Sequence, residues 1–126
     1  MIYIVRKGVI RMKKIYFTIT GMNHYYGDRF FEKGMKVDLV KETHNKVDSE
    51  AIKVTLEGLG TVGYVANSPY TVIGESYSAG HLYDKIGDTA ECTILYVTDK
   101  GIVGYVTVEA KKVLETAVKT AIEATK

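Results

Sequence analysis

The stretch VKETHNKVDSEAIKV, residues 40–54, decides the fold, because in it a polar loop separates two runs of strand character. Apolar and polar side chains alternate along residues 51–56, the period of two that gives a strand one buried and one wet face. Asn45 and Asp48 lie in the loop, where short polar side chains hydrogen-bond nearby backbone and fix its shape. The stretch therefore predicts two neighbouring strands. Their connection either only caps a hairpin or also offers an amide and a carboxylate to a ligand.

The same alternation recurs along the chain and sets the fold class. The other runs of this kind cover residues 14–20, 35–42, 61–66, 89–98 and 102–108. A parallel sheet needs a crossover helix between successive strands, and this chain mostly lacks such helices. The pattern therefore predicts a mainly β (α+β) fold, a small six-stranded OB-like antiparallel barrel.

Two helices are expected outside the strands. Ser68 followed by Pro69 is typical of an N-cap and a first helical position, so a short inserted helix is predicted over residues 69–79, closed by Gly80. Residues 109–126 are predicted to form an amphipathic C-terminal helix with an apolar stripe every four residues. That stripe consists of Leu114, Val118 and Ile122. We expect it to pack on the barrel or on a second copy of the chain in a homodimer.

Length and charge bound the remaining organisation. A chain of 126 residues is one domain by the usual prior. We expect residues 1–13 to be an extension that folding does not need, since Met12 is an equally good start, and residues 14–108 to be the barrel. Residues 1–56 carry 11 Lys or Arg against 6 Asp or Glu, a net +5, whereas residues 57–126 carry 6 against 9, a net −3. A basic half suggests a face that meets an anionic partner.

Cysteine content and hydropathy indicate the compartment. Cys92 is the single cysteine, so the chain cannot form an intramolecular disulfide, which fits a reducing compartment. No apolar run reaches the roughly 18 residues that span a bilayer. We therefore expect a cytoplasmic protein with no membrane partner.

Enzyme chemistry finds little support in the sequence. The candidate nucleophiles and metal ligands, His24, His44, His81 and Cys92, are far apart and lack paired metal-ligand spacing. Cys92 alternates with apolar neighbours and is interpreted as a small buried hydrophobe. The chain has neither a phosphate-binding glycine loop of the Walker type nor a serine nucleophile elbow. We expect no catalytic residue, no metal and no cofactor.

Four segments together resemble the HIRAN domain family. They are residues 21–27 (GMNHYYG), 37–42 (VDLVKE), 45–54 (NKVDSEAIKV) and 62–65 (VGYV). The family pattern reads roughly as a Gly followed by Tyr-Tyr, a Leu-x-x-Glu strand, Asn-x-x-Asp-x-x-Ala-Ile-x-Val, and a Gly-Tyr or Gly-His strand. The third segment is the most specific. The resemblance covers about residues 15–107 and implies a compact β-barrel of the oligonucleotide-binding type. Such domains capture the 3′ end of single-stranded DNA in eukaryotic fork-remodelling ATPases, and small bacterial proteins made of little else also exist.

Carried over residue by residue, the resemblance implies a site for a DNA end. Asp48 stands where end-binding members accept a hydrogen bond from the terminal 3′-hydroxyl. Asn45 matches a polar contact near the same end. Tyr25, or His24 if the loop is aligned differently, matches an aromatic side chain that stacks on a base.

The chain departs from that pattern at three positions. Tyr64 replaces a histidine, Asn67 replaces a lysine that contacts phosphate, and Val47 replaces a second stacking aromatic. Each stacked base contributes roughly 1–3 kcal/mol, so the loss at Val47 weakens binding. The lysines expected to attract phosphate, which are otherwise solvated strand-edge lysines, are Lys41, Lys46 and Lys53.

Two functions of different classes follow from the sequence. The first is a non-catalytic nucleic-acid-binding module that holds single-stranded DNA at a free 3′-hydroxyl. The second is a protein-interaction or structural β-barrel module whose DNA-end site has decayed, with dimerisation through the C-terminal helix.

Overall fold

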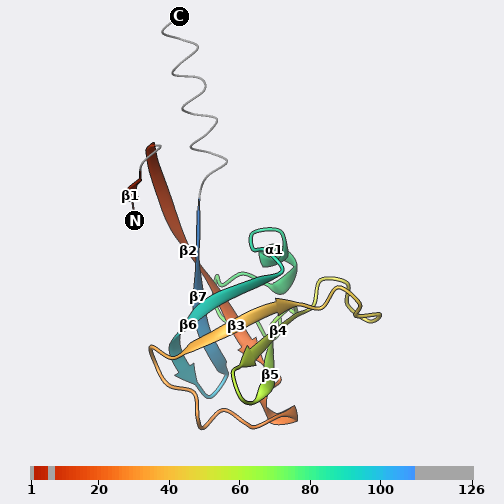
Figure 1. Cartoon of the computed structure of the whole chain (residues 1–126). Coiled ribbons are helices and arrows are strands. Elements are labelled where there is room, and N and C mark those ends of the chain that lie inside the picture. Colours follow the sequence, from red (N-terminus) through yellow and green to blue (C-terminus); the bar gives the residue numbers. More distant parts are fainter. Residues whose placement is uncertain (1, 6–7, 110–126) are drawn as a thin grey trace, which may run out of the picture. The chain divides into compact units, whose positions relative to one another are not determined.

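Six antiparallel strands close into a barrel in the computed structural model, which describes residues 2–5 and 8–109 (Figure 1). The strands are β2 (Gly8–Thr20), β3 (Lys36–Lys41), β4 (Ile52–Leu56), β5 (Gly60–Val65), β6 (Thr89–Thr98) and β7 (Gly101–Glu109). Their order is β2-β5-β4-β3-β6-β7, and β7 pairs back to β2. This arrangement confirms the mainly β, OB-like barrel that the alternating pattern predicts.

The barrel interior is filled by the apolar side chains that the alternation places inward. β2 contributes Ile15, Phe17 and Ile19, each at most 2% exposed. The other strands contribute the buried residues Val37, Leu39, Ile52, Val54, Val62, Val65, Cys92, Ile94, Ile102 and Val106. One wall position requires glycine, because a Cβ on Gly63 would lie 2.9 Å from Cγ2 of Ile19. The register between β4 and β5 shifts beside this glycine.

The chain divides into two units, residues 15–106 and residues 1–14 with 107–126, and each is described by itself. In the second unit, β1 (Ile2–Val5) pairs antiparallel with the first residues of β2, from Ile2 opposite Arg11 to Val5 opposite Gly8. β2 therefore begins at Gly8, six residues earlier than the sequence pattern predicts. Our expectation that residues 1–13 are not needed for folding stays a prediction. The C-terminal helix predicted over residues 109–126, with its homodimer, lies outside the described part of the chain except for Glu109, which is the last residue of β7 and not a helical residue.

The predicted short inserted helix is present between β5 and β6, but its predicted position over residues 69–79 is wrong. Residues 69–76 form turns and bends, and the α-helix of the described part is α1 (Ala79–Tyr83), capped by Ser78, whose Oγ accepts from the N–H of His81 at 3.3 Å. Ser68 does accept the N–H of Tyr70 at 3.2 Å, but the β-branched residues that follow and Gly74, with a φ of 57°, stop the turn from extending. A short 3-10 helix, η1 (Met22–His24), follows β2.

The loop of residues 66–78 folds back onto β2. The hydroxyl of the fully buried Thr18 lies 2.8 Å from that of Ser76 and accepts the N–H of Ile73 at 3.0 Å. The N–H of Tyr77 donates to the carbonyl of Tyr16 at 2.7 Å. These bonds place the loop and α1 beside the loop between β3 and β4.

Candidate nucleic-acid interface

Asn45 fixes the loop of residues 42–51 between β3 and β4. Its Oδ1 accepts the backbone N–H groups of Val47 at 2.9 Å and Asp48 at 2.8 Å. This is the side-chain-to-backbone turn expected of a loop asparagine. Its amide nitrogen also donates to the Glu42 carboxylate at 3.5 Å, a long bond. The loop shape predicted from the sequence is thus confirmed.

The carboxylate of Asp48 is held from two sides. Oδ1 accepts the N–H of Glu50 at 2.9 Å, and Oδ2 accepts the side-chain amide of Asn67 at 3.2 Å. Asn67 in turn accepts the N–H of Gly80 in α1 at 2.8 Å. A carboxylate has about four lone-pair sites, so these two bonds leave capacity for a further hydroxyl donor. Asp48 is therefore oriented while it remains able to accept a hydrogen bond.

Two tyrosines form the other side of the site. Tyr25 follows η1, which packs against β5, and its ring centroid lies 6.2 Å from that of Tyr64 on β5. The hydroxyl of Tyr64 faces the carboxylate of Glu42. This carboxylate, with partial burial and the nearby Tyr25 hydroxyl, raises the pKa of Tyr64 well above its ordinary value. Tyr64 therefore stays protonated and held, while the ring of Tyr25 is 41% exposed.

These contacts define the polar cluster, a continuous set of side chains from β5 and the loops around it. Its members are Tyr25, Glu42, Asn45, Asp48, Tyr64 and Asn67. Five of them were proposed as site residues from the sequence. His24 and Lys46, also proposed, are exposed and do not take part in the contacts above.

Sequence reasoning gave no role to Glu42 or Tyr70. Glu42 occupies the Leu-x-x-Glu position quoted above, which is the signal that could have identified it. Tyr70 is 96% exposed in the turn that Ser68 caps, and nothing in the sequence around Tyr70 indicates that its side chain is exposed. The structure also corrects the expected role of Lys41. Its ammonium donates to the Ile86 carbonyl at 2.8 Å and lies 4.4 Å from the Tyr83 ring centroid, so it is engaged by α1 and the segment that follows this helix.

Cys92 is buried in the barrel, as the alternation predicts. Its thiol donates to the Val37 carbonyl at 3.4 Å, and burial raises its pKa to about 12. In residues 2–5 and 8–109, no three His, Cys, Asp or Glu side chains gather as ligands for a metal ion. Within the same described residues, no helix has the length and apolar character needed to cross a bilayer.

A closed six-stranded barrel with a polar cluster on its connecting loops defines a β-barrel module of the oligonucleotide-binding type. The family model of the HIRAN domain matches residues 12–118 of the chain. The chain therefore belongs to the HIRAN domain family, a family of nucleic-acid-binding modules, which confirms the resemblance seen in the sequence. Searches of curated proteins and of solved structures found no match.

Proposed function

We propose that the polar cluster binds the free 3′-hydroxyl end of single-stranded DNA and performs no catalysis. The observation that carries this proposal is the Asp48 carboxylate, oriented by Glu50 and Asn67 with lone pairs still free. A carboxylate accepts a hydrogen bond from a hydroxyl but repels a phosphate at the same place. Such a site therefore distinguishes a strand that ends in hydroxyl from one that ends in phosphate.

The neighbouring side chains supply the sequence-independent part of the binding. The exposed ring of Tyr25 offers a face to the terminal base. Lys53 lies directly opposite Tyr64 in the β4–β5 register, on the outer face of the barrel, and Lys46 is exposed in the loop beside Asp48. These two lysines attract the phosphates next to the bound end.

The test compares two fluorescein-labelled oligothymidylates that differ only at the 3′ end, hydroxyl or phosphate, by fluorescence anisotropy. A hydrogen bond to a charged group contributes about 1.5–3 kcal/mol, so we expect the hydroxyl end to bind about 10- to 150-fold more tightly. Asp48→Asn removes the negative charge and should lower this ratio towards one. The matched control is Asp99→Asn in the β6–β7 turn, which should leave the ratio unchanged.

Salt provides the second part of the test. Log affinity should fall with log salt with a slope of about −0.7 per phosphate contacted, and Lys46→Ala should make the slope shallower. Equal affinity for the two ends, or no binding at low salt, would contradict the proposal.

A second candidate is a protein-interaction or structural barrel that has lost DNA-end binding. It is favoured by Val47, which is 99% exposed where end-binding members place a stacking aromatic, and by the neutral Asn67. Val47→Tyr separates the two candidates. It should strengthen DNA binding by roughly the 1–3 kcal/mol of one stacked base if the site is functional, and should do nothing if the site has decayed.

A further inference from the structure

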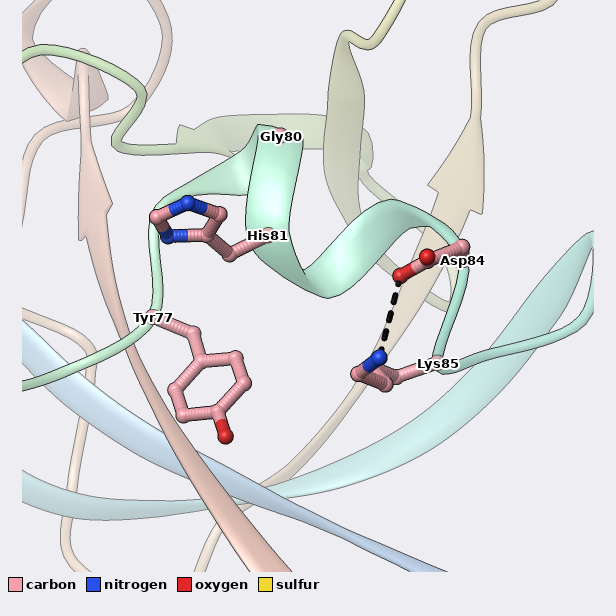
Figure 2. Close-up of a pocket in the computed structure, with 5 residues that line it drawn as sticks. All are labelled: Tyr77, Gly80, His81, Asp84 and Lys85. Carbon is pink, nitrogen blue, oxygen red and sulfur yellow. Dashed lines mark ion pairs between the residues drawn. The ribbon is translucent and has the colours of Figure 1, made fainter. Parts of the chain in front are cut away.

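A pocket lies beside α1, next to the hydrogen bond that joins Gly80 to the polar cluster. It has a volume of about 330 Å³ and is lined by Tyr77, Gly80, His81, Asp84 and Lys85. Figure 2 shows the rings of Tyr77 and His81 on one side and the Asp84–Lys85 ion pair, 3.5 Å apart, on the other. This volume is at the small end of the range for ligand pockets, roughly 300–1,000 Å³.

The walls of this pocket are fixed by the fold. The backbone of Tyr77 is bonded to Tyr16 and bridges to Phe17 of β2. Ala79 and Leu82 of α1 are fully buried, which anchors the helix and turns His81 to the outside. The backbone that carries the two rings is therefore fixed before any ligand arrives, so binding has to order only the side chains.

Gly80 joins the pocket to the proposed DNA-end site. It lines the pocket, and its N–H donates at 2.8 Å to Asn67, whose amide holds Asp48 at 3.2 Å. Gly80 has no side chain, and a Cβ at this position would meet Asn67 and Glu50 oxygens at 3.3 Å. Gly80 and Asn67 therefore connect the pocket directly to Asp48, and the Glu50 carboxylate lies beside this connection.

We propose that this pocket is a second nucleotide subsite on the single-stranded DNA path, a proposal that rests on the function given above. A base lies against the rings of His81 and Tyr77, because aromatic and histidine side chains stack on any of the four bases when it is unpaired. Lys85 binds the adjoining phosphate as a point charge, exchanging part of its pairing with Asp84 for it. The pocket thus holds a nucleotide upstream of the one whose 3′-hydroxyl meets Asp48.

The experiment measures anisotropy with the full chain and 5′-fluorescein oligothymidylates of increasing length, each length prepared with a 3′-hydroxyl and with a 3′-phosphate end. Affinity should rise with length once the strand is long enough to reach the pocket. His81→Ala should remove about 5- to 150-fold of this gain, the contribution of one stacked base, and leave the ratio of hydroxyl-ended to phosphate-ended binding unchanged. His81→Phe, which keeps a stacking ring, should retain the gain, whereas a helix-destabilising effect would appear with either variant.

Charge is tested by Lys85→Ala, with Lys100→Ala in the β6–β7 turn as the matched control. The Lys85 variant should bind long strands more weakly and the control should not. An unchanged length dependence in both His81→Ala and Lys85→Ala would overturn the pocket while the end preference stands. A wild-type chain without end preference, but with a length gain that His81→Ala removes, would overturn the Asp48 site and keep the pocket as a nucleic-acid contact. No binding at any length would overturn both.

Discussion

The barrel wall and the two loops of the polar cluster are held by different forces. In the wall, apolar side chains such as Phe17 and Leu39 are fully buried, and their removal from water stabilises the fold. In the loops of residues 42–51 and 66–78, single side-chain oxygens such as that of Asn45 hold the backbone through hydrogen bonds. The difference implies that wall substitutions act first on the free energy of unfolding, whereas loop substitutions act first on ligand binding.

The largest expected effect comes from removing a wall side chain. Leu39 is 0% exposed in β3, so Leu39→Ala should lower the free energy of unfolding by about 2–5 kcal/mol through lost burial and the cavity left behind. The measurement is urea denaturation followed by far-UV circular dichroism. Leu59→Ala is the control, because Leu59 is 39% exposed in the β4–β5 turn and should change stability far less. Equal losses for the two variants would contradict the buried position of Leu39.

The next largest effect on stability should come from adding a side chain at a crowded glycine. A Cβ on Gly104 in β7 would lie 2.9 Å from Cζ of Phe17 and 3.1 Å from the Thr93 carbonyl. Gly104→Ala should therefore lower the free energy of unfolding by about 1–3 kcal/mol through overpacking. A Cβ on Gly87 meets its nearest atom at 3.9 Å, so Gly87→Ala should unfold in urea as the wild type does. If Gly104→Ala were as stable as the wild type, the barrel wall would have to rearrange around the added methyl group more easily than close packing allows.

Thr18 links the wall to the loops, and its substitution should give a loss similar to that of Gly104→Ala but confined to one region. Thr18→Val keeps the shape of the side chain but leaves the N–H of Ile73 without its acceptor, which should lower the free energy of unfolding by about 1–3 kcal/mol. Amide hydrogen exchange should show the loss of protection concentrated in residues 66–78. Thr89→Val, on an exposed position of β6, serves as the control. Loss of protection spread evenly over the barrel would contradict the local role of Thr18.

Asn45 should have the smallest effect on stability and a clear effect on binding. Asn45→Ala removes the acceptor for the N–H groups of Val47 and Asp48, both in a solvated loop, so the free energy of unfolding should fall by about 1 kcal/mol or less. The preference for hydroxyl-ended DNA should nevertheless fall several-fold, because Asp48 is no longer oriented. Asn45→Asp keeps an acceptor oxygen and should preserve exchange protection at both amides. Retention of the end preference by Asn45→Ala would show that Asp48 does not need this turn.

The sequence predicted the strands well because alternation is a local signal that the barrel reuses. It missed the first residues of β2, since their strand conformation depends on pairing with β1. It placed a helix after Pro69 because Ser68 is a capping residue in either conformation, and only the later residues decide between turn and helix. The Asn45 turn was predictable for the same local reason that the strands were.

The rest of the site depends on contacts between residues distant in the chain. Asn67 and Asp48 are 19 residues apart, and Asn67 and Gly80 are 13 apart. No periodicity relates them, because the barrel closure and the fold of the 66–78 loop bring them together. The approach of Glu42 to Tyr64 likewise needs β3 and β5 in place on either side of β4.

The position of Tyr64 beside Glu42 limits what the proposed site can distinguish. Its hydroxyl faces the Glu42 carboxylate, so Tyr64 presents its ring to an incoming base. The remaining contacts are a carboxylate for a terminal hydroxyl, ring faces for stacking and lysines for phosphate, none of which distinguishes one base edge from another. Strands that end in A, C, G or T should therefore bind with similar affinity. Such a site recognises the end of a strand and has almost no specificity for the base sequence before that end.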